Sequence, residues 1–249
     1  VREEISRMLL GPDPGGALRR LDAFAFLDEV LPEVAAGRGV PQPPEYHPEG
    51  DVLFHTIDVV EKLDRRNLAT TLGALFHDVG KVRTLTVSDR IRFHGHDRIS
   101  CDLAAERMAA LTFPRSVMDA VNELIAEHLR IGSFLSWRRA KQLRFLGRAD
   151  VLDHLALHRA DRLSARAGLE VHAAALAELA RMAAEPPPRA PLLRGDDLLR
   201  LGHPAGPRLR EILEAVRDEQ LEGRLATRDD AVEYVRRKYP LEPGAPSVR

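Results

Sequence analysis

The chain has very little cysteine, few aromatic residues and almost no net charge. Cys101 is the single cysteine among 249 residues, which rules out an internal disulfide and a zinc site built from paired cysteines. Aromatic residues make up 5% of the chain, so the core must consist mainly of Leu, Ala, Val and Ile. The 37 basic and 38 acidic residues give a net charge of −1, which argues against a basic coat for nucleic acid over the whole surface but leaves local patches open.

Long hydrophobic runs are also missing. No run approaches the roughly 18 apolar residues of a membrane span, and no secretory signal is recognisable. A cytoplasmic protein is the expectation that follows by default. With 44% hydrophobic and 30% charged residues, the composition is typical of a globular protein, and the length is ample for a buried core.

The most informative stretch is Ala74-Leu-Phe-His-Asp-Val-Gly-Lys81. His77 and Asp78 end an apolar run, and Gly80 is a candidate helix stop. An imidazole and a carboxylate at one helix end can both reach a divalent ion, although two ligands do not make a site. Lysine is rare, with four residues among 37 basic ones, so Lys81 in this stretch favours a specific role.

His55 lies on the apolar face of a helix predicted over residues 51–66, with Asp51 as its N-cap. Val52, His55 and Val59 are spaced at i, i+3 and i+7, so the imidazole faces the interior. A single histidine in such a place is more often a core residue than a ligand. The adjacent His-Asp pair at the end of the next helix reverses that expectation, because two antiparallel helices bring the start of one near the end of the other.

After the pair, residues 84–93 predict two short β segments around a Ser-Asp turn, or only a loop. His94 and His96 follow, just before a helix predicted over residues 99–111. Either histidine could be a ligand from this position, and either could instead be exposed to solvent. The sequence pattern by itself does not choose between them.

Two later helices carry further candidates. His128 stands near the end of a helix predicted over residues 114–129, beside its buried stripe. Asp161 lies in the helix after that. His154, His158 and Asp161 follow one another at i, i+4 and i+7, so they share a face and could form a site of their own.

The ordered set His, His-Asp, His, His, Asp resembles the HD superfamily of metal-dependent phosphohydrolases. The resemblance implies one or two divalent ions, drawn from Mn, Ni, Co, Fe, Zn or Mg. Asp78 would then bridge ions and orient the attacking water, and Lys81 would hold a phosphate oxygen. In members with one ion, the position of His128 instead touches phosphate or water. The implied ligands are His55, His77, Asp78 and Asp161 for a first ion, and His96 and His128 for a second.

A closer resemblance covers essentially the whole chain. The Pro-rich segment Val40–Asp51 resembles the entrance to the HD domain of CCA-adding tRNA nucleotidyltransferases and poly(A) polymerases, and residues 192–230 resemble their tail. Gly95-His96 matches a Gly-His pair of that family, which favours His96 over His94. The Gly-Ser turn and the Asp-x-Asp pair of the nucleotidyltransferase head are absent, so this polypeptide is not expected to add nucleotides. The chain begins at Val1 rather than Met, which leaves open a head in a longer protein.

The implied fold is mainly α, with at most one short β-hairpin. Residues 1–45 are expected to form a helical neck-like segment and the Pro-rich loop, and residues 46–185 the helical bundle of the HD domain. Residues 186–240 are expected to form a small helical tail that binds RNA. Residues 241–249 are expected to be disordered.

A basic stretch runs from Leu129 to Ala149, where six positive charges and three aromatic rings occur without an acidic residue. Such a cluster suits a phosphate-rich ligand whose bases stack on an aromatic ring or a guanidinium plane. The alternative is a solvated helix face whose arginines pair with acidic residues elsewhere. The candidates for phosphate or RNA binding are Arg138, Arg139, Lys141 and Arg144.

The expected activity follows from the resemblance: hydrolysis of a 2′,3′-cyclic phosphate or a 2′-phosphate on nucleotides or RNA 3′ ends, including tRNA. Two alternatives stay open. One is an RNA-binding body in which the metal is structural or vestigial, and the other is a mononucleotide phosphohydrolase with no role in RNA. The metal, the ester and the oligomeric state are not determined by the sequence.

Overall fold

The computed structural model describes residues 1–44, 50–186 and 190–241. The chain divides into two compact units. Val1–Leu135 and Ala149–Ala175 form the first, and Ser136–Arg148 and Leu176–Arg249 form the second. The domain limits predicted from the sequence stay a prediction, and the predicted disorder at 241–249 lies, except for Leu241, outside the described residues.

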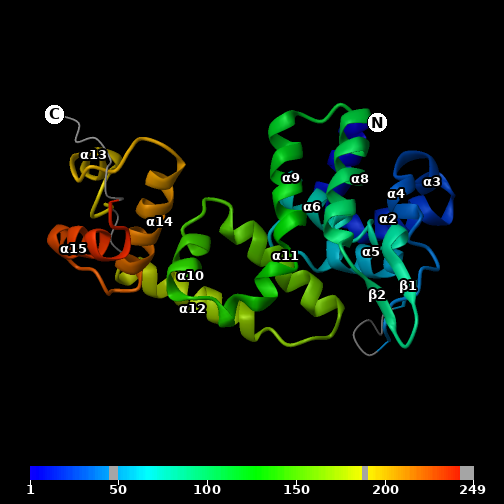
Figure 1. The fold of residues 1–249 in the computed structure, drawn as a ribbon. Helices are drawn as coiled ribbons and strands as arrows, with labels where there is room; N and C mark the ends of the chain where they lie inside the picture. Colours follow the sequence, from blue (N-terminus) through cyan, green and yellow to red (C-terminus); the bar gives the residue numbers. More distant parts are fainter. Residues whose placement is uncertain (45–49, 187–189, 242–249) are drawn as a thin grey trace. The chain divides into compact units, whose positions relative to one another are not determined.

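The first unit is built from helices and a single hairpin among its described residues, which confirms the mainly α class (Figure 1). Its elements are α1 (Arg2–Leu10), α2 (Pro14–Ala23), α3 (Phe26–Val30), α4 (Pro32–Ala35), α5 (Val52–Lys62), α6 (Leu68–Phe76), α7 (Lys81–Thr84), β1 (Leu85–Val87), β2 (Ile91–Phe93), α8 (His96–Ala110), α9 (Arg115–Glu127) and α11 (Val151–Ser164). The strands pair antiparallel, with Leu85 opposite Phe93 and Val87 opposite Ile91, so the predicted hairpin is confirmed.

The N-terminal segment, predicted to be helical, contains the four helices α1 to α4. Ala25 adopts the left-handed conformation, with φ of 60°, and separates α2 from α3. Pro32 then starts α4. A proline is tolerated in the first turn of a helix but disrupts a helix interior, because it has no backbone N–H to donate, so α3 ends before Pro32. Short breaks of this kind leave little trace in hydrophobic spacing.

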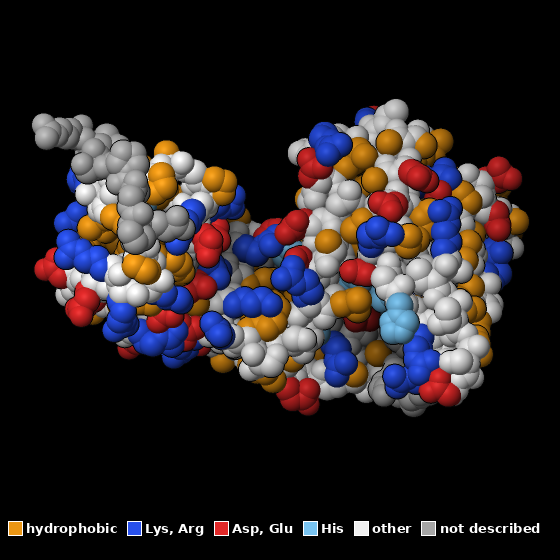
Figure 2. Space-filling model, viewed as in Figure 1, with side chains coloured by type: hydrophobic (Ala, Val, Ile, Leu, Met, Phe, Trp, Pro, Cys, Tyr) orange, Lys and Arg blue, Asp and Glu red, His pale blue; other side chains and the backbone are white. Residues whose placement is uncertain are grey.

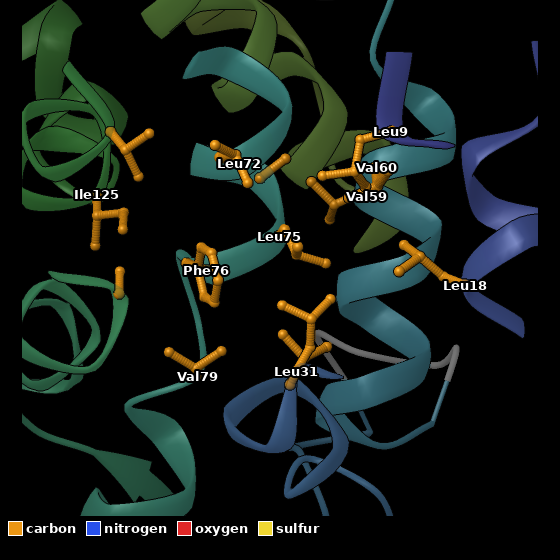
Figure 3. Packing of buried hydrophobic residues seen from close by; sticks show 14 of the residues in the cluster. Leu9, Leu18, Leu31, Val59, Val60, Leu72, Leu75, Phe76, Val79 and Ile125 are labelled. Atoms are coloured by element: carbon orange, nitrogen blue, oxygen red, sulfur yellow. The ribbon is translucent and has the colours of Figure 1, made fainter. Parts of the chain in front are cut away.

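Helix α6 lies at the centre of the core of the first unit. All of its residues from Thr70 to Phe76 are buried, which explains its apolar run. Figure 3 shows Leu75 and Phe76 among side chains from α5 and α9, with Ile125 on the α9 side. Because the buried helix ends at Phe76, the next two residues, His77 and Asp78, also lie in the interior.

The start of α5 is confirmed and its end is earlier than predicted. The Asp51 side chain accepts a hydrogen bond from the backbone N–H of Phe54 at 2.8 Å, as an N-cap does. The helix ends at Lys62, four residues before the expected Arg66. His55 is fully buried, so its predicted inward orientation is confirmed.

The second unit is also helical. Thr227 and Asp230 form a capping box at the start of its last helix. Its core contains Leu198, Ile212 and Val235. Its elements are α10 (Arg139–Leu146), the end of α12 (Glu170–Ala184), α13 (Gly195–Arg200), α14 (Pro207–Leu221) and α15 (Arg228–Lys238); a 3₁₀ helix, η1 (Arg130–Ser136), crosses the boundary between units. In the described part of the chain, no helix has the length and apolar character needed to cross a bilayer.

Candidate metal centre

Five elements of the first unit bring the predicted ligands to one place. Each ligand lies on a helix or within two residues of its end. His55 comes from α5, His77 and Asp78 follow α6, His96 is the first residue of α8, His128 follows α9 and Asp161 lies on α11. Because His96 begins α8, this helix starts three residues earlier than the sequence predicts.

The Asp78 carboxylate lies between two pairs of imidazoles and is 2% exposed. Its Oδ2 atom is 3.2 Å from Nε2 of His77 and 3.4 Å from Nε2 of His55. Its Oδ1 atom is 3.2 Å from Nε2 of His96 and 3.9 Å from Nε2 of His128. One carboxylate therefore faces two separate sets of nitrogen ligands, as a bridging ligand between two ions would.

Two groups among the described residues have the spacing of a metal site. The ligand atoms of His55, His77 and Asp78 lie within 4.8 Å of one another, and so do those of Asp78, His96 and His128. Asp161 approaches the first group, with Oδ1 at 3.1 Å from Nε2 of His55. The assignment of these residues as ligands stays a prediction, and their arrangement allows one ion or two.

The residues present fit a divalent ion. The Nε2 atoms of His77, His96 and His128 are buried and have no hydrogen-bond partner among the described residues. A buried polar atom without a partner is costly, and a metal ion would satisfy all three nitrogens. Imidazole with carboxylate ligation suits Mn, Fe, Co, Ni or Zn, and does not exclude Mg.

The same three histidines share a second feature. Nδ1 of each lies close to the backbone carbonyl three residues earlier, at 2.8 Å for His77, 2.8 Å for His96 and 2.6 Å for His128. A carbonyl only accepts hydrogen bonds, so Nδ1 donates its proton and Nε2 of the neutral ring keeps a lone pair directed into the site. Backbone geometry thus prepares these rings to bind metal.

Both carboxylates of the site are held in the ionised form. Burial would raise the pKa of Asp78, but the charges of His77 and Lys81 hold this pKa well below its usual value. Burial would also raise the pKa of Asp161, and the adjacent His55 ring lowers it instead. Two anionic ligands are therefore present at neutral pH.

The pKa values of two of the histidines are shifted in opposite directions. Burial, helped by the charge of His77, lowers the pKa of His128 to about 4, so this ring is neutral at pH 7. Burial also acts to lower the pKa of His96, but the adjacent Asp78 carboxylate outweighs burial and raises this pKa. A neutral ring is the form that binds metal.

Lys81 is buried in the same site, at 6% exposure. Its Nζ lies 2.6 Å from Oδ2 of Asp78 and donates a hydrogen bond to Oε1 of Gln42 at 2.7 Å. Gln42 is not among the site residues predicted from the sequence. The available signal was a polar residue between Pro41 and Pro43 in a segment that leads into the His55 helix.

Gly80 has a different role from the one predicted. Helix α6 ends at Phe76, and Gly80 has a φ of −68°, which any residue adopts, so it is not a left-handed helix stop. A Cβ atom on Gly80 would lie 2.2 Å from the backbone oxygen of His96. Glycine is required there because the start of α8 passes close to this turn, and that approach places His96 beside Asp78.

A pocket of about 400 Å³ opens onto the centre. Asp78, Lys81 and Asp161 contribute to its wall, together with Arg90 from the hairpin turn and Phe93 from β2. On this face of the first unit, Figure 2 shows a histidine side chain at the surface with Lys and Arg side chains nearby. The hairpin thus supplies positive charge and an aromatic ring next to the candidate ligands.

The other histidines that the sequence offered as ligands lie outside the two groups of possible metal ligands. His94 is exposed and lines the pocket without belonging to either group of three. Nε2 of His154 lies 3.3 Å from Oδ2 of Asp150. His154, His158 and Asp161 do not gather as possible metal ligands in the part of the chain that the structure describes.

The basic stretch lies in the second unit, apart from its first residues. Arg139 and Arg144 are each paired with an acidic side chain, at 3.7 and 2.6 Å, as the alternative interpretation of this stretch expected. Nζ of Lys141 lies 3.9 Å from the centre of the Trp137 ring. Binding of phosphate or RNA by these residues and Arg138 stays a prediction.

Comparison with known proteins identifies the family to which this region belongs. Residues 50–166 match the HD domain family. The chain contains an HD domain. The matched region spans all the candidate ligands from His55 to Asp161, including the adjacent pair His77-Asp78.

The regions around the HD domain also match known proteins. The chain is 34% identical over 242 residues to a CC-adding tRNA nucleotidyltransferase of Thermus thermophilus, covering 93% of this chain and 54% of that protein. It is 31% identical over 265 residues to an A-adding tRNA nucleotidyltransferase of Deinococcus radiodurans, covering 98% and 59%. A multifunctional CCA protein of Herminiimonas arsenicoxydans is 35% identical over 150 residues, covering 59% and 36%. The chain is thus homologous to the HD-containing region of these enzymes and spans somewhat more than half the length of the first two.

Proposed function

We propose that the HD domain is a metal-dependent phosphohydrolase that acts on the 2′,3′-cyclic phosphate or 2′-phosphate of a nucleotide or an RNA 3′ end. The observation that carries this proposal is the position of Asp78 between two pairs of buried imidazoles, in a pocket that also holds Lys81. A nucleotidyltransferase needs a different arrangement of carboxylates, which this chain lacks.

A divalent ion held by His55, His77, Asp78 and Asp161 would supply Lewis acidity and an activated water for attack on phosphorus. Asp78 is anionic at neutral pH, so it can orient a water molecule by accepting a hydrogen bond from it. The ammonium of Lys81 has three N–H donors, of which two are directed to Asp78 and Gln42. The third is available for a phosphate oxygen of the substrate.

The rest of the pocket suits a nucleotide. A volume of about 400 Å³ lies within the range of small-molecule sites. Arg90 is exposed at its wall and can attract a second phosphate or an RNA backbone, whereas Arg92 is held by Asp89, with Nη1 at 2.7 Å from Oδ1. The Phe93 ring offers a surface on which a base can stack.

RNA binding is a second candidate function. The relatives in Thermus and Deinococcus are named as tRNA nucleotidyltransferases, and Trp137 with its basic neighbours could bind a phosphate backbone in the second unit. In this proposal the protein binds tRNA and is located in the cytoplasm. The metal would then be structural.

The deciding experiment measures hydrolysis of 2′,3′-cyclic AMP, 2′-AMP and 3′-AMP by metal-stripped protein, with Mn, Ni, Co, Mg or Zn added back singly. Turnover restored by metal and abolished in Asp78→Ala supports the phosphohydrolase and identifies its ester. No turnover with any metal, together with tight tRNA binding, supports the RNA-binding body instead.

A further inference from the structure

His55 is held differently from the other three histidines of the centre. Their Nδ1 atoms lie against backbone carbonyls, but Nδ1 of His55 lies 3.2 Å from Oγ of Ser164 on α11. Ser164 is 1% exposed, so this contact is shielded from solvent. The orientation of one candidate ligand therefore depends on a side chain 109 residues away in sequence.

The hydrogen-bond direction at Ser164 follows from its second partner. Oγ of Ser164 lies 2.8 Å from Oδ2 of Asp58. A carboxylate only accepts, so the single hydroxyl proton of Ser164 points to Asp58. The hydroxyl oxygen then accepts from Nδ1–H of His55, and Nε2 of the neutral ring keeps its lone pair toward Asp78 and Asp161.

Asp58 is itself fixed by Lys62, four residues later on the same helix face. Nζ of Lys62 pairs with Oδ2 of Asp58 and donates a hydrogen bond to the backbone carbonyl of Leu163 at 3.2 Å. The result is a continuous chain from Lys62 through Asp58 and Ser164 to His55. None of its three supporting side chains belongs to the wall of the pocket.

The two helices contribute in the same way. On α5, His55 is followed three residues later by Asp58, and on α11, Asp161 is followed three residues later by Ser164. Residues three apart lie on the same helix face, so each helix presents one candidate ligand and one supporting group. The support is thus built into the same face that carries the ligand.

We propose that Ser164 and Asp58 are positioning residues that fix the tautomer and orientation of His55 and so set the affinity of the ion bound on the His55 side of Asp78. Partners of this kind orient metal-binding histidines, and their loss typically weakens metal binding about 10- to 100-fold. The proposal rests on the proposed metal site but not on the ester that is hydrolysed.

Because only His55 contacts a side chain through Nδ1, the proposal predicts weaker binding of one ion and not of the other. A backbone carbonyl cannot be removed by a side-chain substitution, so His77, His96 and His128 keep their support in any Ser164 or Asp58 variant. Only His55 loses the hydrogen bond to its Nδ1 atom that Ser164 provides. The ion on the side of His96 and His128 is therefore expected to bind as before.

The test titrates Mn²⁺ or Zn²⁺ into metal-free protein by calorimetry and compares Ser164→Ala with Thr71→Val. The control removes a buried hydroxyl of the first unit whose hydrogen bond goes to the backbone carbonyl of Asn67 at 2.9 Å, and so touches no candidate ligand. We expect about a tenfold or greater loss of affinity in Ser164→Ala. We expect a change below about twofold in Thr71→Val, and recovery in Ser164→Thr, which keeps the hydroxyl.

A second readout separates positioning from a general loss of structure. In zinc-loaded protein labelled with ¹⁵N-histidine, the Nδ1–H signal of His55 should exchange faster with water in Ser164→Ala, while the signals of the other three histidines stay unchanged. Asp58→Asn should act in the same direction, because its amide can donate to Ser164 and turn the hydroxyl proton toward His55.

The proposal is overturned if Ser164→Ala and Asp58→Asn, both folded, bind metal within about twofold of the unaltered protein and leave the His55 signal unchanged. Should Ser164→Ala fail to fold, Asp58→Asn and Ser164→Thr decide by the same criteria. The stated metal effects in a protein that hydrolyses none of the three nucleotides would support this inference and refute the phosphohydrolase.

Discussion

Charged side chains have different surroundings in the two units. In the first, Asp78 is almost fully buried and lies within 4 Å of four imidazoles and an ammonium group. In the second, the side chains of the ion pair between Arg144 and Asp218 are 47% and 37% exposed. A carboxylate is thus shielded from water at the centre of the first unit and partly hydrated in this pair of the second, although exposed pairs such as Arg7 and Glu4 also occur in the first unit.

This difference determines what each charge can do. Burial weakens screening, so one group in the first unit changes the pKa and the ligand properties of its neighbours. When two exposed charged side chains pair, each gives up interactions with water for the interaction with its partner, so the net gain in stability is small. Substitutions should therefore have large effects at the buried centre and small effects at the surface pairs, and five measurements test this.

The largest effect is expected for Asp78→Asn. This change removes the anionic group shared by both sets of ligands, and metal catalysis is worth several kcal/mol, so hydrolysis should fall by about a thousandfold or more. Metal binding by calorimetry should be lost in parallel. Asp89→Asn is the matched control, because this aspartate is 70% exposed on the hairpin turn, and its activity should stay within about threefold. Equal losses in both variants would contradict the prediction.

Lys81→Met should have the next largest effect. It keeps the length of the side chain but removes the donor to Asp78, Gln42 and the proposed phosphate oxygen, so kcat/KM should fall about 10- to 100-fold. Metal affinity should change much less than in a ligand variant. Arg83→Met, an exposed cation two residues away, provides the control. Unchanged kinetics in Lys81→Met would exclude a role in substrate binding.

Buried histidines should make the stability of the metal-free protein depend on pH. The pKa values of His128 and His158 are each lowered to about 4, from about 6.5 when unfolded. As the pH falls from 6.5 to 4 the unfolded chain binds protons first, so each histidine should lower the free energy of unfolding, by about 2 kcal/mol between pH 7 and 5. The raised pKa of His96 opposes this in part, because its contribution is present at low pH and lost as the pH rises.

Urea unfolding in the presence of a chelator at pH 7 and pH 5 measures this change. His158→Gln removes one of the two contributions without altering a candidate metal ligand, so its pH dependence should be clearly smaller than that of the unaltered chain. Equal stability at the two pH values would show that these histidines are not buried in the neutral form.

Charge reversal in the basic stretch tests the second unit. Arg138→Glu combined with Lys141→Glu should lower kcat/KM for an RNA substrate about tenfold and reduce its salt dependence, while hydrolysis of a mononucleotide stays within about twofold. Equal effects on both substrates would indicate a mononucleotide phosphohydrolase.

The smallest effect is expected for Arg144→Ala. Its partner Asp218 is partly exposed, and exposed ion pairs typically contribute below about 1 kcal/mol. The free energy of unfolding, measured with urea, should therefore change by less than that amount. A loss of several kcal/mol would show that the two units do not differ in the way proposed.

Local signals in the sequence were reliable where one helix face or one turn decided the outcome. The spacing around His55 predicted its burial, Asp51 predicted the N-cap of α5, and residues 84–93 predicted a hairpin or a loop, of which the structure has the hairpin. The role of Gly80 could not be predicted from such local signals. Its neighbour in space is the backbone of His96, and no pattern within one helix contains that contact.

The supporting groups were missed for the same reason. Gln42 reaches Lys81 across 39 positions, and Ser164 reaches His55 across 109. Serine and glutamine are common in loops and at helix ends, so neither residue stands out by type. Only the approach of α11 to α5 shows that Ser164 supports His55.

The sequence by itself indicated amphipathic helices and, through its resemblance to a known family, the HD motif and the candidate ligands, because helix periodicity and short motifs are local properties. The tertiary structure decided which nitrogen of each ring faces Asp78, which ligands share that carboxylate, and that His55 depends on side chains where its counterparts depend on the backbone. These features arise from contacts between helices distant in sequence, and the geometry of such contacts is set by packing of the whole core.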